Sequence, residues 1–245
     1  MFQFPIGIFN FVEEDTGGGT RIFGTEKVWN HVYVFELDPS DLTELDYVDE
    51  STTSWKAGKS YGIGGAGDDI FIRAENDSSN NYLFTLNKAT LDEATTVDTT
   101  PLYSTMFVGG MSSRLFGSSG STTDKLFELD PSDGSIIGSE EAGHGSNARD
   151  VGGTDDQLFH VDTGNDGFFE VDPDDLSTAL QSDTSTWGTV LCPMGGNSTQ
   201  MFARYSSTPT YIELDPDDIG TSLQTKNGWY HSGESSHGSI GGLKS

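Results

Sequence analysis

The amino-acid sequence predicts an all-β protein, a β-propeller of about five four-stranded blades, with six blades as the alternative. Three observations lead to this fold class: a repeated aromatic-Glu-Leu-Asp-Pro segment, a repeated Gly-Gly pair, and the lack of apolar residues at helical spacing. The repeated segments are centred on Leu37, Leu86, Leu129, Val171 and Leu214, at intervals of 49, 43, 42 and 43 residues. A period of this length is typical of propeller blades.

The repeated segment predicts a strand that runs into a turn. In Phe127-Glu128-Leu129, alternation places Phe127 and Leu129 on one face of a strand and Glu128 on the other. The Asp-Pro that follows ends the strand, because aspartate starts turns readily and proline has no backbone donor. The four clear copies are Phe35–Pro39, Phe127–Pro131, Phe169–Pro173 and Ile212–Pro216, and a worn copy is Phe84–Lys88.

The Gly-Gly pair predicts the innermost strand of each blade. After each complete pair, four intervening residues are followed by an apolar residue and a phenylalanine, which begin the next strand. Because inner strands converge on the propeller axis, small residues there let the backbones approach one another. We therefore expect a packing role for these glycines rather than a ligand site. The complete pairs are Gly64-Gly65, Gly109-Gly110, Gly152-Gly153 and Gly195-Gly196.

Two fragments at the ends of the chain predict how the ring closes. Gly17-Gly18 follows a polar run, whereas the C-terminal Ser239–Gly242 matches the inner-strand pattern. We expect this C-terminal segment to supply the inner strand of the first blade. The predicted organisation is a single propeller domain over residues 17–245, preceded by an apolar arm or extra strand over residues 1–16. The arm would either pack on the first blade or dock on a neighbouring subunit; its large apolar residues are Phe2, Phe4, Ile6, Ile8, Phe9 and Phe11.

The charge composition predicts a protein adapted to salt. The 245 residues include 39 acidic and 12 basic ones, for a net charge of −27. A compact surface with this charge repels itself, and molar salt removes most of the repulsion by shortening the screening length to about 3 Å. We therefore expect a haloarchaeal or haloarchaeal-virus origin, with an ordinary acidic secreted protein as the alternative. No basic stripe exists to bind nucleic acid, and no apolar run is long enough to span a membrane.

The motifs that could carry chemistry are weak. Gly62–Gly67 matches G-x-G-x-x-G, but Asp68 and Asp69 follow it directly and would repel phosphates. Asp162–Gly167 faintly resembles a calcium loop, yet lacks the acid at its third position and the glutamate at its twelfth, so a plain turn is expected. The only cysteine, Cys192, is expected in an apolar inner strand. The histidines form no metal-ligand pair; they are His31, His144, His160, His231 and His237.

Other reactive groups remain unassigned. Asn76 and Asn197 begin glycosylation sequons on predicted turns, and a pair of carboxylates suited to glycoside hydrolysis could be hidden among the 39 acids. We therefore expect no catalytic, cofactor-binding or metal-binding residue.

The unit Leu126–Gly134, preceded by a Gly-Gly pair and an apolar-Phe pair, resembles blades of the broad quinoprotein/YVTN-like propeller superfamily. The resemblance extends over nearly the whole chain and implies the fold, not an activity. The tryptophan-docking and cofactor-binding residues of quinoprotein enzymes have no counterparts here, so no quinone cofactor is expected.

These observations predict a non-enzymatic structural or binding propeller. We expect a virion component of a haloarchaeal virus: a capsid decoration, spike or tail protein on the virion surface. Its expected partners are other virion subunits, further copies of itself, and a host cell-surface glycan or glycoprotein. The alternative is a haloarchaeal enzyme or ligand-binding propeller with an axial site, located in the cytoplasm or at the cell surface.

Overall fold

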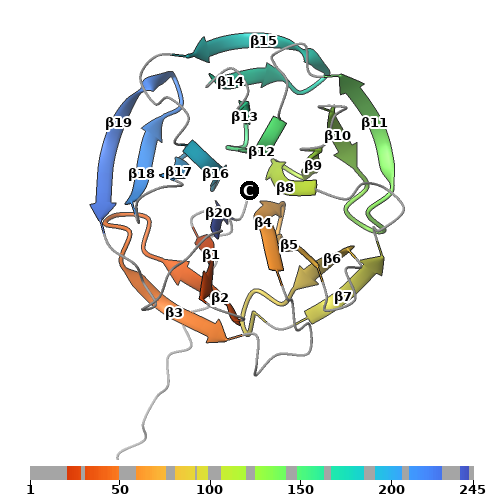
Figure 1. Ribbon diagram of the computed structural model, residues 1–245, viewed down its shortest axis with the longest axis vertical. Helices are drawn as coiled ribbons and strands as arrows, with labels where there is room; N and C mark the ends of the chain where they lie inside the picture. Colours follow the sequence, from red (N-terminus) through yellow and green to blue (C-terminus); the bar gives the residue numbers. More distant parts are fainter. Residues whose placement is uncertain are drawn as a thin grey trace, which may run out of the picture.

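The protein is a five-bladed β-propeller with four antiparallel strands in each blade, as the repeats predicted (Figure 1). The computed structural model describes twelve segments of the chain. They are residues 21–28, 31–49, 59–75, 81–91, 93–98, 106–119, 125–141, 148–162, 167–184, 191–205, 210–227 and 238–242.

Each blade runs from an inner strand at the axis to an outer strand at the circumference. Blade 1 is formed by β20 (Gly238–Gly242), β1 (Ile22–Val28), β2 (His31–Leu37) and β3 (Glu44–Asp49). Blade 2 is formed by β4 (Lys59–Ala66), β5 (Asp69–Glu75), β6 (Asn81–Leu86) and β7 (Glu93–Asp98). Blade 3 is formed by β8 (Met106–Met111), β9 (Arg114–Ser119), β10 (Lys125–Leu129) and β11 (Ile136–Glu141). Blade 4 is formed by β12 (Ala148–Gly153), β13 (Leu158–Asp162), β14 (Gly167–Asp172) and β15 (Asp175–Asp183). Blade 5 is formed by β16 (Leu191–Gly196), β17 (Met201–Tyr205), β18 (Thr210–Asp215) and β19 (Asp218–Asn227).

The C-terminal strand closes the ring, as the sequence predicted. Strand β20 pairs antiparallel with β1, placing Gly241 opposite Phe23 and Ile240 opposite Gly24. Blade 1 is therefore assembled from both ends of the described chain. The apolar arm predicted over residues 1–16 lies outside the described residues.

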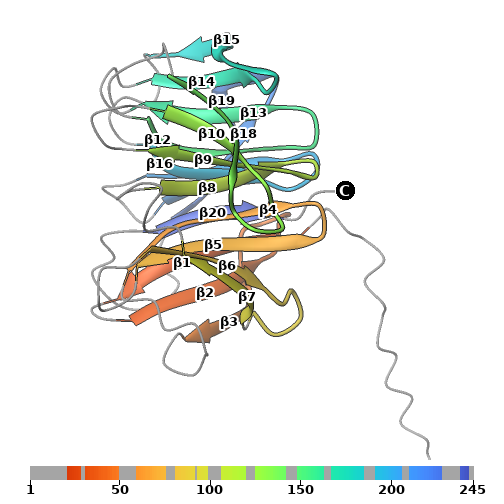
Figure 2. The same cartoon turned by 90° about the vertical axis from the view of Figure 1, so that its right-hand side faces the viewer.

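The turns between third and fourth strands and, in blades 2 to 5, the turns between first and second strands lie at one face, because successive strands are antiparallel (Figure 2). We call this the turn face. The turns between third and fourth strands have two forms. In blades 1, 2 and 3 the turn ends on a residue with positive φ, namely Leu42, Leu91 and Gly134. In blades 4 and 5 the turn is shorter, and Asp172 pairs with Asp175, and Asp215 with Asp218.

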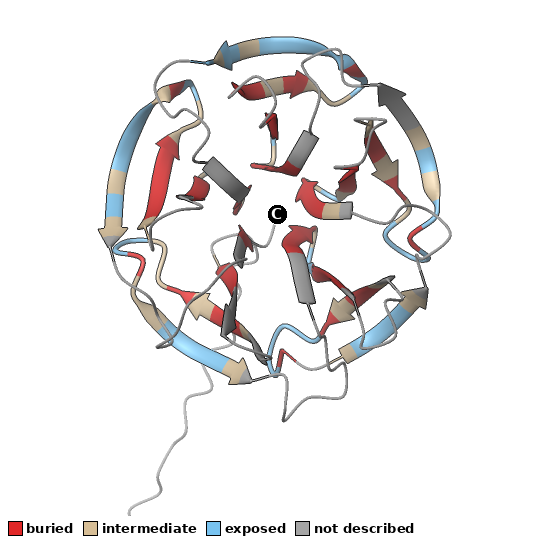
Figure 3. Cartoon of the chain, in the orientation of Figure 1, coloured by how far each residue is buried: buried red, intermediate tan, exposed pale blue. Residues whose placement is uncertain are grey.

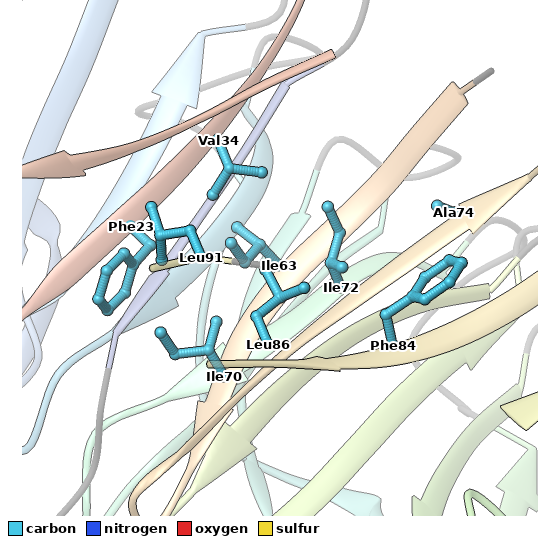
Figure 4. Close-up of a cluster of buried hydrophobic side chains, with 9 residues drawn as sticks. All are labelled: Phe23, Val34, Ile63, Ile70, Ile72, Ala74, Phe84, Leu86 and Leu91. Atoms are coloured by element: carbon cyan, nitrogen blue, oxygen red, sulfur yellow. The ribbon is translucent and has the colours of Figure 1, made fainter. Parts of the chain in front are cut away.

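The hydrophobic core lies between the blades rather than at the axis. One cluster fills the space between blades 1 and 2, where Phe23 and Val34 face Ile63, Ile70 and Leu86 (Figure 4). The phenylalanine of each apolar-Phe pair is fully buried; these residues are Phe23, Phe71, Phe116, Phe159 and Phe202. Burying each contributes about 1.5–3 kcal/mol. Exposed residues are concentrated instead on the outer strands (Figure 3).

Candidate functional site

The glycine pairs bring the inner strands into backbone contact around the axis. A Cβ added to Gly109 would lie 1.9 Å from the carbonyl oxygen of Val151 in blade 4. One added to Gly241 would lie 2.4 Å from the carbonyl oxygen of Ile63 in blade 2. The predicted packing role of these glycines is confirmed, and at their level neighbouring inner strands leave no room for a side chain.

Hairpins on the turn face strengthen this inner ring. The N–H of Gly67 donates to the carbonyl of Ser112 at 2.7 Å, which joins blades 2 and 3. The N–H of Asp155 donates to the carbonyl of Ser198 at 3.0 Å, which joins blades 4 and 5. The G-x-G-x-x-G segment thus lies in β4 and the β4–β5 hairpin, with no helix N-terminus for a pyrophosphate to meet.

Carboxylates of the Asp-Pro turns accept hydrogen bonds from the turns themselves. Asp130 Oδ1 accepts from the N–H of Ser132 at 2.8 Å and from its hydroxyl at 2.6 Å. These bonds, the hydroxyl first, hold the pKa of Asp130 below its ordinary value. Hydrogen bonds from Thr43 lower the pKa of Asp41, and those from Ser177 and Thr178 lower that of Asp175. These carboxylates of the turn face therefore stabilise the turns by accepting hydrogen bonds within them.

A second arrangement, which we call the clasp, ties neighbouring blades together at the turn face. In the clasp a glutamine or arginine donates to the glutamate of its own blade and to the Pro carbonyl of the next blade's Asp-Pro turn. In blade 5, Gln224 Nε2 donates to Glu213 Oε2 at 2.7 Å and to the Pro39 carbonyl of blade 1 at 2.9 Å. Gln200 supports it by donating to Glu213 Oε1 at 3.0 Å.

Equivalent clasps join blade 4 to blade 5 and blade 3 to blade 4. Gln181 Nε2 donates to Glu170 Oε2 at 2.7 Å and to the Pro216 carbonyl at 3.0 Å. In blade 3 one guanidinium replaces the glutamine: Arg114 donates to both carboxylate oxygens of Glu128 and to the Pro173 carbonyl. The hydrogen bond to Glu128 is the main cause of the raised pKa of Arg114.

Blade 2 departs from this pattern at every clasp position. Asp69 stands where other blades have arginine or glutamine, Thr85 stands where they have glutamate, and Lys88 stands where they have proline. Lys88 instead forms an exposed ion pair with Asp68 at 3.0 Å. Asp69 has no amide or guanidinium N–H to donate to the Pro131 carbonyl of blade 3, so the clasp chemistry is lost there. The worn sequence copy thus corresponds to a blade joined differently to its neighbours.

A third repeated feature lies on the outer strands. Each has a β-bulge opposite the Glu-Leu pair of the repeat, or opposite its counterparts Thr85-Leu86 in blade 2 and Glu170-Val171 in blade 4. The residue that the ladder skips is Leu45, Ala94, Ile137, Leu180 or Leu223, in blades 1 to 5 respectively. The four large ones have exposed fractions of 59%, 62%, 55% and 56% for Leu45, Ile137, Leu180 and Leu223. Among the side chains that the structure describes, the only other large apolar one so exposed is Tyr47, also on β3. We call these outer strands the rim.

The remaining residues singled out by the sequence are distributed as follows. His160 is buried and stacks on Phe169 with ring centroids 5.1 Å apart, so its predicted structural role is confirmed. Cys192 lies in inner strand β16, and Asp162 ends β13. Asn197 is buried, and its Nδ2 donates to Gln200 Oε1 at 2.8 Å, so this sequon is not presented for glycosylation. His31 lies in β2. Outside the described residues lie Asn76, His144, His231, His237 and positions 163–166.

Within the described segments, no three His, Cys, Asp or Glu side chains come together as a metal ion would require. No helix long and apolar enough to cross a membrane occurs there either. Sequence reasoning missed the clasp residues and the exposed bulge residues, although both leave a signal. The clasp signal is an arginine or glutamine directly before the apolar-Phe pair in four blades: Arg21, Arg114, Gln157 and Gln200. The bulge signal is an aliphatic residue eight or nine positions after the central Leu or Val of the repeat.

Comparison with known proteins shows the fold alone. No protein-family model and no curated protein sequence matches the chain. A chain in the crystal structure of the nidogen/laminin complex is 9% identical, with a TM-score of 0.52, covering 89% of this chain and 98% of that one. Glutaminyl cyclase of Myxococcus xanthus is 13% identical, with a TM-score of 0.51, covering 68% and 69%. A chain of the mitotic checkpoint complex is 14% identical with a TM-score of 0.44; the match covers 84% of this chain and 62% of that one.

Proposed function

We propose that this protein is a non-enzymatic structural or binding propeller that is a subunit of a larger assembly. The finer proposal is a virion component of a haloarchaeal virus: a capsid decoration, spike or tail protein at the virion surface that contacts the host. The observation that carries the proposal is the distribution of exposed apolar side chains. On a strongly acidic protein they lie at equivalent positions on the rim, where a contact surface for other subunits would lie.

The packing of the inner strands supports the non-enzymatic part of this proposal. Propeller sites for small ligands need a concave space with a few converging polar groups. At the level of the glycine pairs the inner strands are in backbone contact instead. The repeat glutamates of blades 3, 4 and 5, Glu128, Glu170 and Glu213, are engaged in clasps.

The charge supports an environment of high salt. The chain has a net charge of −27, and described acids such as Asp130 and Glu213 lie in its turns and clasps. Salt ions screen the repulsion among such charges, which lowers its cost to the stability of the fold. This is the basis of the halophilic part of the proposal, and virion surfaces in brine meet the same condition.

The test is fractionation of a high-salt culture that produces the protein, by density gradient in molar KCl, with the chain detected by mass spectrometry. We expect the chain to sediment with assembled particles and to stay with them after washing. Recovery solely in the fraction of free soluble proteins would contradict the proposal, and a small molecule retained by the free chain in native mass spectrometry would favour the axial-site alternative.

A further inference from the structure

The joints between neighbouring blades are not all built alike at the turn face. We name each joint by its two blades in ring order, so that joint 5–1 is the one where the ring closes. Each joint holds one of the five clusters of the hydrophobic core. In four joints the second blade adds a buried aliphatic side chain from its turn between third and fourth strands, or from the residue directly after that turn. These residues are Leu42 in joint 5–1, Leu91 in joint 1–2, Leu176 in joint 3–4 and Ile219 in joint 4–5.

The turn of blade 3 brings no such side chain to joint 2–3. Gly134 stands where blades 1 and 2 have Leu42 and Leu91, and like them it has positive φ. A Cβ at this position would lie 3.2 Å from Leu83 Cδ2 of blade 2, but glycine leaves that contact unmade. Ile136, two residues further on, packs against the cluster of this joint and is only half-buried. The core of joint 2–3 is therefore less well covered at the turn face than that of the other joints.

The same turn of blade 3 also has no clasp to hold it against blade 2. Asp69 and Thr95 occupy the two positions from which clasped blades donate, and neither has an amide or guanidinium N–H. Pro131 of this turn is exposed. By contrast, the prolines whose carbonyls accept clasp hydrogen bonds are half-buried; they are Pro39, Pro173 and Pro216. Joint 2–3 thus lacks two kinds of contact that joints 3–4, 4–5 and 5–1 have.

The joint at which the ring closes is fastened in both ways. Gln200 and Gln224 of blade 5 both donate to the Pro39 carbonyl of blade 1, at 3.4 Å and 2.9 Å. Leu42 is fully buried in the same joint. The chain also crosses this joint, because β20 follows blade 5 in sequence and pairs with β1 of blade 1. We therefore do not expect the ring to open first where its two ends meet.

The inner part of joint 2–3 is held firmly, which limits how the joint can move. The N–H of Gly67 donates to the Ser112 carbonyl at 2.7 Å, and a Cβ added to Gly110 would collide with the Gly65 carbonyl. These contacts lie in the inner strands and their hairpins, close to the axis (Figure 1). A movement in this joint would therefore separate its outer part and leave the inner ring closed.

We propose that joint 2–3 is the deformable joint of the propeller. The turn of blade 3 parts from blade 2 at the turn face more readily than joints 3–4, 4–5 and 5–1 open, while the inner ring stays intact. Each of the two missing contacts, a buried aliphatic side chain and a clasp hydrogen bond, should favour opening by about 10-fold. This inference goes beyond the proposed function and does not depend on it, since a deformable ring could serve an assembly subunit or a free protein.

The experiment measures how fast a thiol reagent labels a cysteine buried in each joint, with the full-length folded protein in molar KCl. The central leucine of the repeat offers matched positions, because Leu37, Leu129 and Leu214 are fully buried in joints 5–1, 2–3 and 4–5. Each is replaced by cysteine in a separate variant that also has Cys192→Ala, since Cys192 is the only cysteine of the chain. Urea unfolding gives the global stability of each variant, and each labelling rate is corrected for global unfolding.

We expect Leu129→Cys to be labelled at least about 10-fold faster than Leu37→Cys and Leu214→Cys, because joint 2–3 opens without unfolding of the ring. A repaired variant adds Asp69→Arg and Thr85→Glu, which reproduce the arginine and glutamate of the blade 3 clasp. The repair should slow the labelling of Leu129→Cys by about 5- to 10-fold and leave that of Leu214→Cys unchanged.

The reciprocal variant, Gln157→Ala/Gln181→Ala, removes both donors to the Pro216 carbonyl in joint 4–5. It should speed the labelling of Leu214→Cys by at least about 5-fold. Because it weakens a joint rather than rebuilding one, it tests the role of the clasp even if the repaired ring does not fold.

The inference is overturned if the three cysteines are labelled at equal corrected rates, as they would be in a ring that opens only by complete unfolding. It is also overturned if Leu37→Cys is labelled fastest, which would place the opening at the closure of the ring. An unchanged rate for Leu129→Cys in a folded repaired variant, or for Leu214→Cys in the reciprocal variant, would show that clasps do not control the opening of joints.

Discussion

At the residue scale, position in the ring rather than residue type decides what each acid and each glycine does. Asp130 is half-buried and Asp175 is exposed, yet both complete a turn by accepting hydrogen bonds from serine. Gly109 has no space for a Cβ, whereas a Cβ on Gly138 of the same blade would meet nothing within 4 Å. The sequence alone identified the paired glycines, because they recur, but it left the 39 acids undifferentiated.

The turn carboxylates predict an acid-sensitive contribution to stability. A folded-state pKa below the unfolded value of about 3.9 stabilises the fold above that value, and the stabilisation is lost as pH falls through the folded pKa. Replacing Ser132 with alanine removes the hydroxyl donor, so we expect the pKa of Asp130 to rise. Carbon-detected NMR titration measures this, with Asp175 in the same sample as an internal control. An unchanged pKa of Asp130 would refute the assignment.

The glycine contacts predict a sharp contrast between two substitutions in blade 3. Gly109→Ala should reduce the free energy of unfolding by at least about 1–3 kcal/mol, because its Cβ meets backbone atoms that cannot move aside. Gly138→Ala should be neutral or stabilise by up to about 1 kcal/mol. Urea unfolding in molar KCl compares them, and equal effects would show that the inner ring is less tightly packed than described.

At the scale of the element, the clasp explains why the Phe-Glu-Leu-Asp-Pro segment recurs intact. Its Glu and its Pro belong to different joints: Glu213 holds the donor that reaches blade 1, and Pro216 receives the donor from blade 4. The number of strands, their order and the closing role of β20 followed from the repeat period and from strand alternation. The clasps did not, because they join residues as far apart as Pro39 and Gln224. The recurring arginine or glutamine before the apolar-Phe pair marks a donor, but it does not show which residue that donor reaches.

The clasp predicts unequal effects at one ladder position in two blades. Gln224 pairs with Glu213 in blade 5, and Thr95 holds the same place opposite Thr85 in blade 2. Gln224→Ala should cost about 1–3 kcal/mol, because Glu213 Oε2 loses its donor and the Pro39 carbonyl keeps only the longer hydrogen bond from Gln200, at 3.4 Å. Thr95→Ala should change stability by less than about 0.5 kcal/mol. Chemical unfolding of both variants decides, and a comparable loss in blade 2 would contradict the clasp.

At the scale of the whole molecule, exposed aliphatic side chains lie on the rim of a strongly acidic ring. The blade count and the fold class were predictable because every unit repeats one strand pattern. The candidate contact surface was not predictable, since strand alternation does not reveal the bulges at which Leu180 and Leu223 lie on the exposed outer strands. Even so, the sequence indicated that blade 2 is unusual, and the structure locates that difference in its clasp and its bulge residue.

The charge of the molecule predicts that its stability rises with salt. Raising KCl from 0.1 M to 1 M shortens the screening length from about 10 Å to about 3 Å, which weakens repulsion among the acids of the turn face. We expect the thermal unfolding midpoint to rise steadily over this range. A midpoint as high in dilute buffer as in molar salt would mean that the protein is not adapted to brine.

The central claim is that the rim, and not the axis, is the contact surface of this propeller. Hydrogen–deuterium exchange of the chain within its native assembly, compared with the free chain in the same salt, tests it most directly. If the rim makes the contact, protection should increase in outer strands such as β15 or β19, with the hairpins of the inner ring unchanged. Protection confined to the inner hairpins, at residues 67–68, 112–113, 154–157 and 197–200, would contradict it and indicate an axial site instead.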